Sequence, residues 1–471
     1  MKTKIFFLFS IILGLVILSS LNNSSEIQKK PNIIFIAVDD LRPQLNCYGK
    51  SQIISPNIDY LASNSYTYEN AVCNFPVCGA SRASLLTGLR PNKNRFKSFR
   101  TRMDEDADDV LTIGEWFKSN DYFTLSLGKI SHHTNDSPES WSITAWRGEK
   151  NWRDYQTKEN IFAAKTNNNN GAAKAFEIGE NLNDDYGDTK MVNKAIEKLD
   201  ELTAKEQPFF MALGFLKPHL PFNAPKKYWD LYNEKDIKLA TNRYQPKNSP
   251  DISMHKYGEL RKYTNIPSDF NIDVPDSTQK KLIHGYYACV SYIDDEIGKL
   301  IKHLKKLEIY DNSIIVLWGD HGWQLGEHNL WAKHCNYQTS LKVPLLIKYP
   351  KQKTQKRIRS VVELLDIYPT LCELSNIDKP NHLQGKSLLT INKLDPENLN
   401  GYTKYHKGET VTTTEKSYTE WRNKDNNYLK AKMMYDLVKD PDENINISKN
   451  KENASSILKF QHLLDSVRLL D

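Results

Sequence analysis

A cysteine at the predicted start of a short helix has neighbours that suit it to bind an anion. The stretch that ends at Gly88 is predicted to be a loop followed by a helix that begins near Gly79 or Ala80. A helix start presents unpaired N–H groups and the positive end of the helix dipole. Arg82, in the first turn, adds a guanidinium fork that matches a tetrahedral oxyanion. For Cys78 alone, the alternative is a buried structural thiol.

Three carboxylates follow apolar runs of the chain and predict a cation site. Asp39 and Asp40 directly follow one run, and Asp320, with His321 next to it, follows another. Acidic groups gathered in one cleft repel each other, and a bound cation removes this repulsion. Oxygen ligands favour Ca²⁺ or Mg²⁺ over zinc. For any one of these residues, a helix cap or a surface loop is the alternative.

Two lysines and two histidines add hydrogen-bond donors and titratable groups near the same run ends. A single histidine is more often structural than functional. A set of four such groups opposite a cation site predicts an oxyanion pocket, because catalysis needs donors aimed at developing negative charge. The four are Lys129, His132, His219 and Lys333.

The apolar runs themselves predict a parallel sheet. Residues 33–38, 122–127, 209–215 and 314–318 are apolar runs that each end in a polar cluster. A continuously apolar run is typical of a strand covered on both faces. In an open α/β sheet, ligands gather outside the carboxyl ends of the strands. The sequence therefore predicts an α/β fold in which one rim of the sheet collects these polar residues, with Cys78 beside them.

The rest of the chain predicts helices around the sheet and long excursions over its edge. Residues 134–190 and 222–276 lack a regular period and are predicted to form loops that decide specificity. From residue 386 we expect a smaller C-terminal unit. The other predicted elements are helices at 56–62, 111–119, 191–203, 278–307, 360–374 (interrupted near Pro369) and 454–470, and a strand at 345–350.

The N-terminus predicts export. Lys2 and Lys4 precede an apolar run at residues 5–18, and small and polar residues follow. This pattern is typical of a secretory signal peptide, and the run is short for a membrane-spanning helix, which is the alternative. We expect a periplasmic or secreted protein with no stable membrane span after signal removal. The predicted organisation is a signal peptide at 1–25, a catalytic domain at 26–385 and a C-terminal subdomain at 386–471.

Charge and composition fit an anionic substrate. The 471 residues carry a formal net charge of +6, which agrees better with an anionic partner than with a cationic one. No basic run with interleaved aromatic residues indicates nucleic-acid binding. Hydrophobic residues make up 39% of the chain, as in an ordinary globular protein.

The Cys78 stretch resembles the sulfatase signature: Cys or Ser, any residue, Pro or Ala, any residue, Arg, and then a Leu-Thr-Gly tail. The matching positions are Cys78, Ala80, Arg82 and residues 86–88, with Ala80 standing where Pro is commoner. Over about residues 31–445 the chain is similar to type I sulfatases, closest to the iduronate-2-sulfatase branch. Further stretches that carry the resemblance are 38–43, 47–49, 217–222, 291–294, 319–323, 325–328, 331–333, 384–388 and 435–437.

This resemblance implies an alkaline-phosphatase-like fold, with a large mixed, mostly parallel sheet between helices and a smaller C-terminal α+β subdomain. It also implies that a formylglycine-generating maturation enzyme converts Cys78 to 3-oxoalanine (Cα-formylglycine). In sulfatases this aldehyde is hydrated and acts as the nucleophile. The implied ligands of a calcium ion are Asp39, Asp40, Asp320, His321 and the modified Cys78.

The resemblance further implies a role for each remaining residue. Arg82 and Lys129 would hold the diol and the sulfate. One diol hydroxyl would attack sulfur, and the leaving oxygen would take a proton from His219 or Lys333, which also contact the sulfate. His132 would then deprotonate the second hydroxyl, so that sulfate is expelled and the aldehyde returns.

These implications favour an exported sulfatase that acts on a sulfated polysaccharide or its oligosaccharides. Ulvan, an algal glycan of sulfated rhamnose and uronic acids, is the favoured substrate, and animal glycosaminoglycans are the alternative. A phosphomonoester or phosphonate hydrolase of the same superfamily is a second hypothesis. A catalytically silent glycan-binding protein is a third, if Cys78 is never modified.

Overall fold

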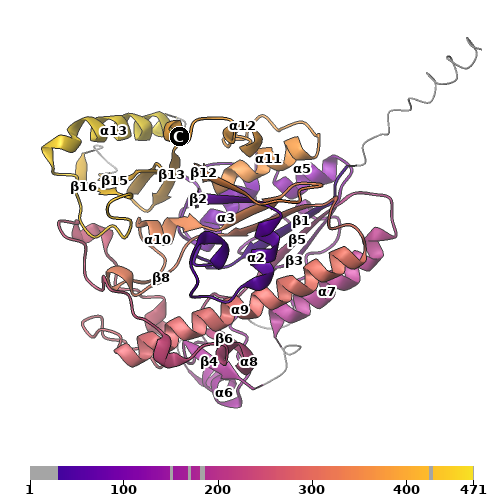
Figure 1. Ribbon diagram of the computed structural model, residues 1–471, viewed down its shortest axis with the longest axis horizontal. Coiled ribbons are helices and arrows are strands. Elements are labelled where there is room, and N and C mark those ends of the chain that lie inside the picture. The colour runs from indigo at the N-terminus through magenta and orange to yellow at the C-terminus, as the bar shows by residue number, and fades with distance from the viewer. Residues whose placement is uncertain (1–29, 149–151, 168–170, 181–185, 424–427, 470–471) are drawn as a thin grey trace, which may run out of the picture. The chain divides into compact units, whose positions relative to one another are not determined.

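Four parallel strands form one half of the main sheet. In the computed structural model, β1 (Ile33–Val38) lies between β5 (Phe209–Phe215) and β7 (Ile314–Gly319), and β3 (Phe123–Gly128) follows on the far side of β5 (Figure 1). These strands are the four apolar runs of the sequence. Residues of β1, β5 and β7 are buried throughout, which explains why their sequences do not alternate.

The register of these strands makes their ends coincide. Val38 pairs with Phe215 on one side and with Gly319 on the other. The chain therefore leaves β1, β5 and β7 at one edge of the sheet, which places Asp39 and Asp320 next to each other. This confirms the predicted rim of polar residues.

The other half of the sheet is mixed. Beyond β7, the strand order continues through β11 (Leu345–Lys348), β2 (Tyr66–Val72) and β10 (Lys342–Val343), all paired antiparallel. Strand β12 (Lys356–Glu363) pairs parallel with β2. The β2 and β12 strands were not predicted from the sequence.

One predicted helix was partly wrong. Residues 360–363 belong to β12, and the helix α11 begins only at Ile367. Pro369 does not interrupt this helix, because it lies in the first turn, where a backbone N–H has no helical partner in any case.

Helices cover both faces of the sheet, as Figure 1 shows. Alternate side chains of β1 enter two separate cores. Ile34 and Ile36 pack with residues of α2, α7 and α9, whereas Ile33 and Phe35 pack with residues of α3, α5 and α11. The bounds of these helices are Pro56–Ser63 (α2), Gly187–Thr203 (α7), Asp276–Lys306 (α9), Cys78–Thr87 (α3), Ile113–Ser119 (α5) and Ile367–Leu374 (α11).

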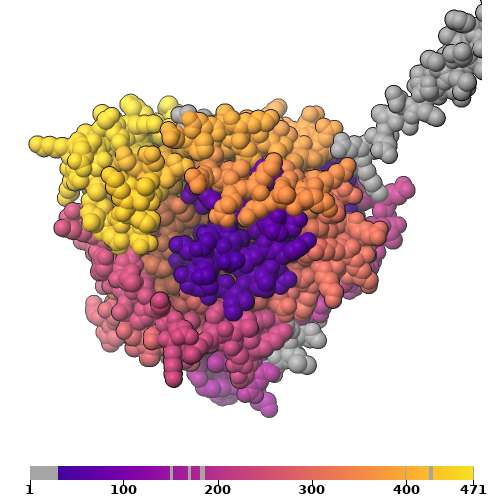
Figure 2. All heavy atoms as spheres, in the orientation of Figure 1, coloured from indigo at the N-terminus to yellow at the C-terminus, as the bar shows by residue number. Residues whose placement is uncertain are grey.

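A smaller antiparallel sheet closes the chain and confirms the predicted α+β character of this part. Its strands β13 to β16 pair in sequence order, and helix α13 packs on it through a small core of its own. Figure 2 shows this C-terminal part against residues of the 222–276 excursion, where Asn446 Nδ2 donates to the Asn248 carbonyl oxygen at 2.9 Å. The bounds are Gly401–Tyr405 (β13), Gly408–Thr412 (β14), Lys416–Arg422 (β15), Leu429–Asp436 (β16) and Ala454–Arg468 (α13).

The structure describes residues 30–148, 152–167, 171–180, 186–423 and 428–469. The chain divides into units at residues 1–31 and 32–471, and the predicted signal peptide lies outside the described residues. Among the described helices, none combines the length and apolar character that crossing a bilayer requires. The remaining elements are α4 (Met103–Asp106), α6 (Lys158–Thr166), α8 (Lys226–Trp229), α10 (Gln338–Leu341), α12 (Leu388–Ile391), β4 (Phe176–Gly179), β6 (Phe222–Pro225), β8 (Gln324–Leu325) and β9 (Trp331–Ala332).

Candidate active site

Cys78 is the first residue of helix α3, close to where the sequence predicts a helix start. The helix ends at Thr87, and Gly88 follows in the left-handed conformation with φ of 72°. Gly79 must be a glycine, because a Cβ there would lie 2.7 Å from the Phe99 carbonyl oxygen. The Cys78 side chain is buried, and its Sγ lies 3.2 Å from His321 Nε2 and 3.9 Å from Asp40 Oδ1.

The carboxylates come from the ends of β1 and β7, and all are fully buried. Asp40 has a positive φ of 61°, and its backbone N–H donates to Asp320 Oδ1 at 3.0 Å. The Tyr286 hydroxyl donates to the Asp40 carbonyl oxygen at 2.9 Å. Helix α9 and both strand ends thus fix the turn that presents Asp40 toward Cys78.

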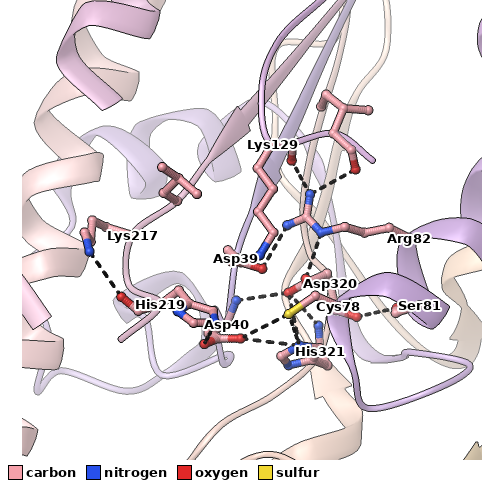
Figure 3. A network of polar contacts seen from close by, with 12 residues as sticks. Asp39, Asp40, Cys78, Ser81, Arg82, Lys129, Lys217, His219, Asp320 and His321 are labelled. Carbon is pink, nitrogen blue, oxygen red and sulfur yellow. Dashed lines mark hydrogen bonds and ion pairs between the residues drawn. The ribbon is translucent and has the colours of Figure 1, made fainter. Parts of the chain in front are cut away.

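Arg82 and Lys129 neutralise two of these carboxylates (Figure 3). Arg82 donates through Nε to Asp320 Oδ2 at 2.9 Å and through Nη2 to Asp39 Oδ1 at 3.1 Å. Its Nη1 donates to the carbonyl oxygens of Lys129 and Ile130. Lys129 Nζ donates to Asp39 Oδ2 at 2.5 Å. Arg82 therefore ties α3 to the ends of three strands.

Lys333 and His219 meet at a carboxylate that sequence analysis missed. Lys333 Nζ lies 3.1 Å from Asp40 Oδ1 and 3.1 Å from Glu259 Oε1. His219 Nε2 lies 3.3 Å from the same Glu259 oxygen, and its Nδ1 lies 2.6 Å from the Leu220 carbonyl oxygen. Glu259 belongs to the aperiodic 222–276 excursion, where nothing in the sequence distinguishes it from neighbouring acids.

The predicted cation ligands converge. Donor atoms of Asp39, Asp40, Cys78 and His219 lie within 4.8 Å of one another, and those of Cys78, Asp320 and His321 do so as well. Cys78 Sγ stands in for the oxygen that a formylglycine would present. A set dominated by buried carboxylate oxygens fits a hard cation such as Ca²⁺.

Two adjacent carboxyl groups have opposite pKa shifts. Burial is the largest influence on Asp40, and together with the neighbouring Asp39 carboxylate it raises the pKa of Asp40 to about 7, although Lys333 opposes this rise. For Asp39, burial also acts to raise the pKa, but Lys129 and Arg82 outweigh it and hold the pKa well below its usual range. The neighbouring cationic side chains therefore compensate the carboxylate of Asp39 more fully than that of Asp40. A cation bound beside Asp40 would supply the missing positive charge.

The environment of the site shifts the pKa values of the Cys78 thiol and the His132 imidazole. Burial, followed by Asp39, raises the pKa of the Cys78 thiol well above its ordinary value, so an unmodified thiol would be a poor nucleophile. Burial and the nearby Lys129 lower the pKa of His132 to about 2, so its imidazole is neutral at pH 7.

A cavity of about 910 Å³ opens onto these groups. Asp39, Cys78 and four of the predicted catalytic residues line it, whereas Arg82 does not, because its guanidinium lies fully buried behind the carboxylates. The structure thus brings all predicted site residues together but places Arg82 in a supporting position. The four lining residues are Lys129, His132, His219 and Lys333.

The resemblance implies sulfate-ester hydrolysis, and for that reaction, assayed with p-nitrophenyl sulfate, we expect Glu259→Gln to lower kcat/KM by about tenfold. Lys333 and His219 would lose their shared counter-charge and their orientation. Steady-state kinetics measures this effect. Glu234→Gln is the matched control, since Glu234 forms an ion pair with Lys281 at a partly exposed position of the same excursion. Equal kinetics for Glu259→Gln and the unsubstituted protein would show that Glu259 plays no part in catalysis.

The mixed, mostly parallel sheet with helices on both faces and a smaller C-terminal α+β part is the predicted alkaline-phosphatase-like fold. The chain belongs to the sulfatase family, whose model matches residues 31–377. A second model, described as N-sulphoglucosamine sulphohydrolase, C-terminal, matches residues 326–469. The protein is therefore a sulfuric ester hydrolase, as the sequence predicted.

Individual relatives agree with this assignment. The iduronate 2-sulfatase of Mus musculus is 31% identical over 413 residues, covering 79% of this chain and 74% of the relative. A sulfatase of Formosa agariphila is 32% identical over 489 residues, covering 98% and 92%. An ulvan-active sulfatase of the same species is 28% identical over 381 residues, covering 78% and 66%.

A solved structure confirms the fold. The phosphonate monoester hydrolase of Agrobacterium radiobacter matches with a TM-score of 0.75 and 19% identity, covering 94% of this chain and 96% of that chain. Because this neighbour acts on another ester class, the fold by itself does not select sulfate.

Proposed function

We propose that this protein is an exported sulfatase that removes sulfate esters from a sulfated polysaccharide or its oligosaccharides, through a formylglycine at position 78 and a calcium ion. The observation that carries the proposal is the convergence of Cys78, which lines the cavity, with the buried side chains of Asp40 and His321. Export rests on the signal-peptide pattern at residues 1–25. Maturation requires a formylglycine-generating enzyme as a partner.

In this proposal, the residues of the site divide the chemistry among themselves. The hydrated aldehyde at position 78 supplies the attacking hydroxyl, and a bound calcium ion supplies positive charge among the carboxylates. Lys129 and Lys333, on the cavity wall, bind the sulfate oxygens. His219, beside Lys333, protonates the leaving sugar oxygen, and the neutral His132 accepts a proton from the second hydroxyl. Arg82 acts from behind by fixing Asp39 and Asp320.

Asp39, Asp40, Asp320, His321 and the modified Cys78 would hold the calcium ion. We expect chelation by EGTA to abolish hydrolysis of p-nitrophenyl sulfate and added Ca²⁺ to restore it. Chelation should also lower the thermal unfolding midpoint, because three buried carboxylates would lose their cation. Activity and unfolding midpoint that both survive exhaustive chelation would rule out the metal. Restoration by Mg²⁺ alone would identify a different ion.

Ulvan is the favoured substrate. The similarity to an ulvan-active sulfatase of Formosa agariphila supports ulvan, whereas the similarity to mammalian iduronate 2-sulfatases supports a uronate-containing glycan more generally. The deciding experiment measures sulfate release from ulvan oligosaccharides and from heparin oligosaccharides side by side. Release from ulvan alone supports the favoured substrate, release from heparin alone points to a glycosaminoglycan sulfatase, and release from neither removes the glycan proposal.

A phosphonate or phosphomonoester hydrolase is the second candidate, favoured by the fold shared with the Agrobacterium radiobacter enzyme. The distinguishing measurement is kcat/KM for p-nitrophenyl sulfate against p-nitrophenyl phosphate and phenyl phenylphosphonate. We expect the sulfate ester to be the better substrate.

A further inference from the structure

Two exposed aromatic side chains line the same cavity as Cys78. Trp152 exposes 40% of its surface and Phe99 exposes 54%, although large aromatic side chains are usually buried. Single exposed apolar residues are common and need no explanation. These two differ, because both stand on the wall of a functional cavity.

Each ring contacts one of the two histidines to which the proposed function gives a proton-transfer role. The Trp152 ring lies 5.0 Å from the His219 ring, nearly perpendicular to it. The Phe99 ring lies 6.3 Å from the His132 ring, also edge to face. The two aromatic rings therefore lie directly beside the residues that would act on the sulfate ester.

Each ring is also paired with an arginine. The Arg153 guanidinium carbon lies 4.2 Å from the Trp152 ring centroid, and that of Arg100 lies 5.6 Å from the Phe99 centroid. A cation over the ring holds its orientation and adds positive charge at the cavity margin. Apolar rings with positive charge beside them match a sugar unit, which has an apolar C–H face and, in a sulfated glycan, negative groups.

The size of the cavity points the same way. Its volume of about 910 Å³ lies near the top of the range, roughly 300–1,000 Å³, that encloses whole organic ligands. One sulfated sugar would leave much of it empty.

We propose that Trp152, with Phe99, binds the sugar units that neighbour the one carrying the sulfate ester, so that the substrate is an anionic oligosaccharide of at least two units. This inference rests on the proposed function and extends it from the reacting group to the rest of the substrate. In this arrangement, the aromatic rings contribute to oligosaccharide binding and not to cleavage of the ester bond.

The test compares a long substrate with a short one. The quantity measured is kcat/KM for size-fractionated ulvan and heparin tetrasaccharides divided by kcat/KM for p-nitrophenyl sulfate. We expect Trp152→Ala and Phe99→Ala each to lower this ratio by about tenfold, and Trp152→Phe to lower it less because a ring remains. Phe162→Ala is the matched control, since Phe162 is 68% exposed on α6 and lies outside the cavity wall.

An unchanged ratio in both alanine variants overturns the inference, whether the two rates stay the same or fall together. Titration calorimetry of the tetrasaccharides with the Cys78→Ala protein separates binding from turnover. The subsite is supported if tetrasaccharides bind the Cys78→Ala protein and bind the Cys78→Ala, Trp152→Ala protein more weakly. If the protein that keeps Cys78 releases no sulfate from the same tetrasaccharides, only the proposed function fails. Absence of tetrasaccharide binding, in a protein that hydrolyses p-nitrophenyl sulfate, overturns the subsite and leaves the hydrolase.

Discussion

Replacing Cys78 with alanine is expected to lower kcat/KM for p-nitrophenyl sulfate by about ten-thousandfold or more, because the proposed function assigns the nucleophile to position 78. The same change should alter the free energy of unfolding by only about 1 kcal/mol. The Sγ atom is small, and the helix that carries it is held by Arg82 and by Ser81, whose hydroxyl donates to the Asp320 carbonyl oxygen at 2.5 Å. Activity assays and urea denaturation of the purified variant check the two halves of this prediction.

Cys73→Ala is the matched control for this experiment. Cys73 is equally buried and lies five positions earlier in the chain, but it is not on the cavity wall. We expect this variant to lose some stability, because a buried sulfur is removed, and to keep its activity. A Cys78→Ala protein with more than about a tenth of the original activity would show that another group is the nucleophile.

The second large effect is expected for Arg82→Ala. Removing the guanidinium leaves the carboxylates of Asp39 and Asp320 buried with one partner fewer, which typically costs about 3–5 kcal/mol of unfolding free energy. We also expect a loss of activity of about a thousandfold or more, because these carboxylates set the geometry around Cys78. Denaturation in the presence of EGTA measures the stability change without compensation by a metal ion.

Two variants define the limits of the Arg82 prediction. Arg82→Lys keeps the charge but lacks the fork that reaches both carboxylates, so its stability should fall between those of the alanine variant and the unsubstituted protein. Arg357→Ala removes a half-exposed ion pair with Glu69 and should cost about 1 kcal/mol or less. If Arg82→Ala costs no more than Arg357→Ala, the guanidinium does not hold the site together.

The parallel half of the sheet was predictable because its strands are largely buried on both faces. Such strands are mostly apolar, and the ends of β1 and β7 are marked by the first carboxylates, Asp39 and Asp320. Parallel pairing then brings those residues to one rim. The helix that begins at Cys78 was predictable from Gly88, which stops it in a left-handed conformation.

Other strands were not predictable, because their sequences carry no comparable signal. The first half of β12 is charged and largely exposed, and its buried half, residues 360–363, contains the apolar Val361 and Val362 only a few residues before the apolar helix α11. In β2, polar Glu69 and Asn70 interrupt the buried positions. A short apolar run such as those in β2 and β12 fits a helix as well as a strand, and only the tertiary structure decides between them.

Parts of the candidate site were also predictable from the sequence, and other parts were not. Residue types and strand ends identified the carboxylates, the lysines and the histidines, but not the depth of each side chain. Arg82 was predicted to hold the anion; the structure shows its guanidinium bound to Asp39 and Asp320 and off the cavity wall, so a contact with the anion stays a prediction. Glu259 was missed because it belongs to a segment without periodicity, and only the fold brings it to Lys333 and His219.

The most direct test of the account is the mass of the tryptic peptide Ser51–Arg82, prepared from protein made in cells that contain a formylglycine-generating enzyme. We expect an aldehyde in place of the Cys78 thiol, reactive toward an aminooxy probe, in a fraction of molecules that rises in proportion to the specific activity. A peptide that carries only the thiol, in protein that still hydrolyses sulfate esters, would contradict the account. The same thiol in inactive protein would favour a silent glycan-binding protein.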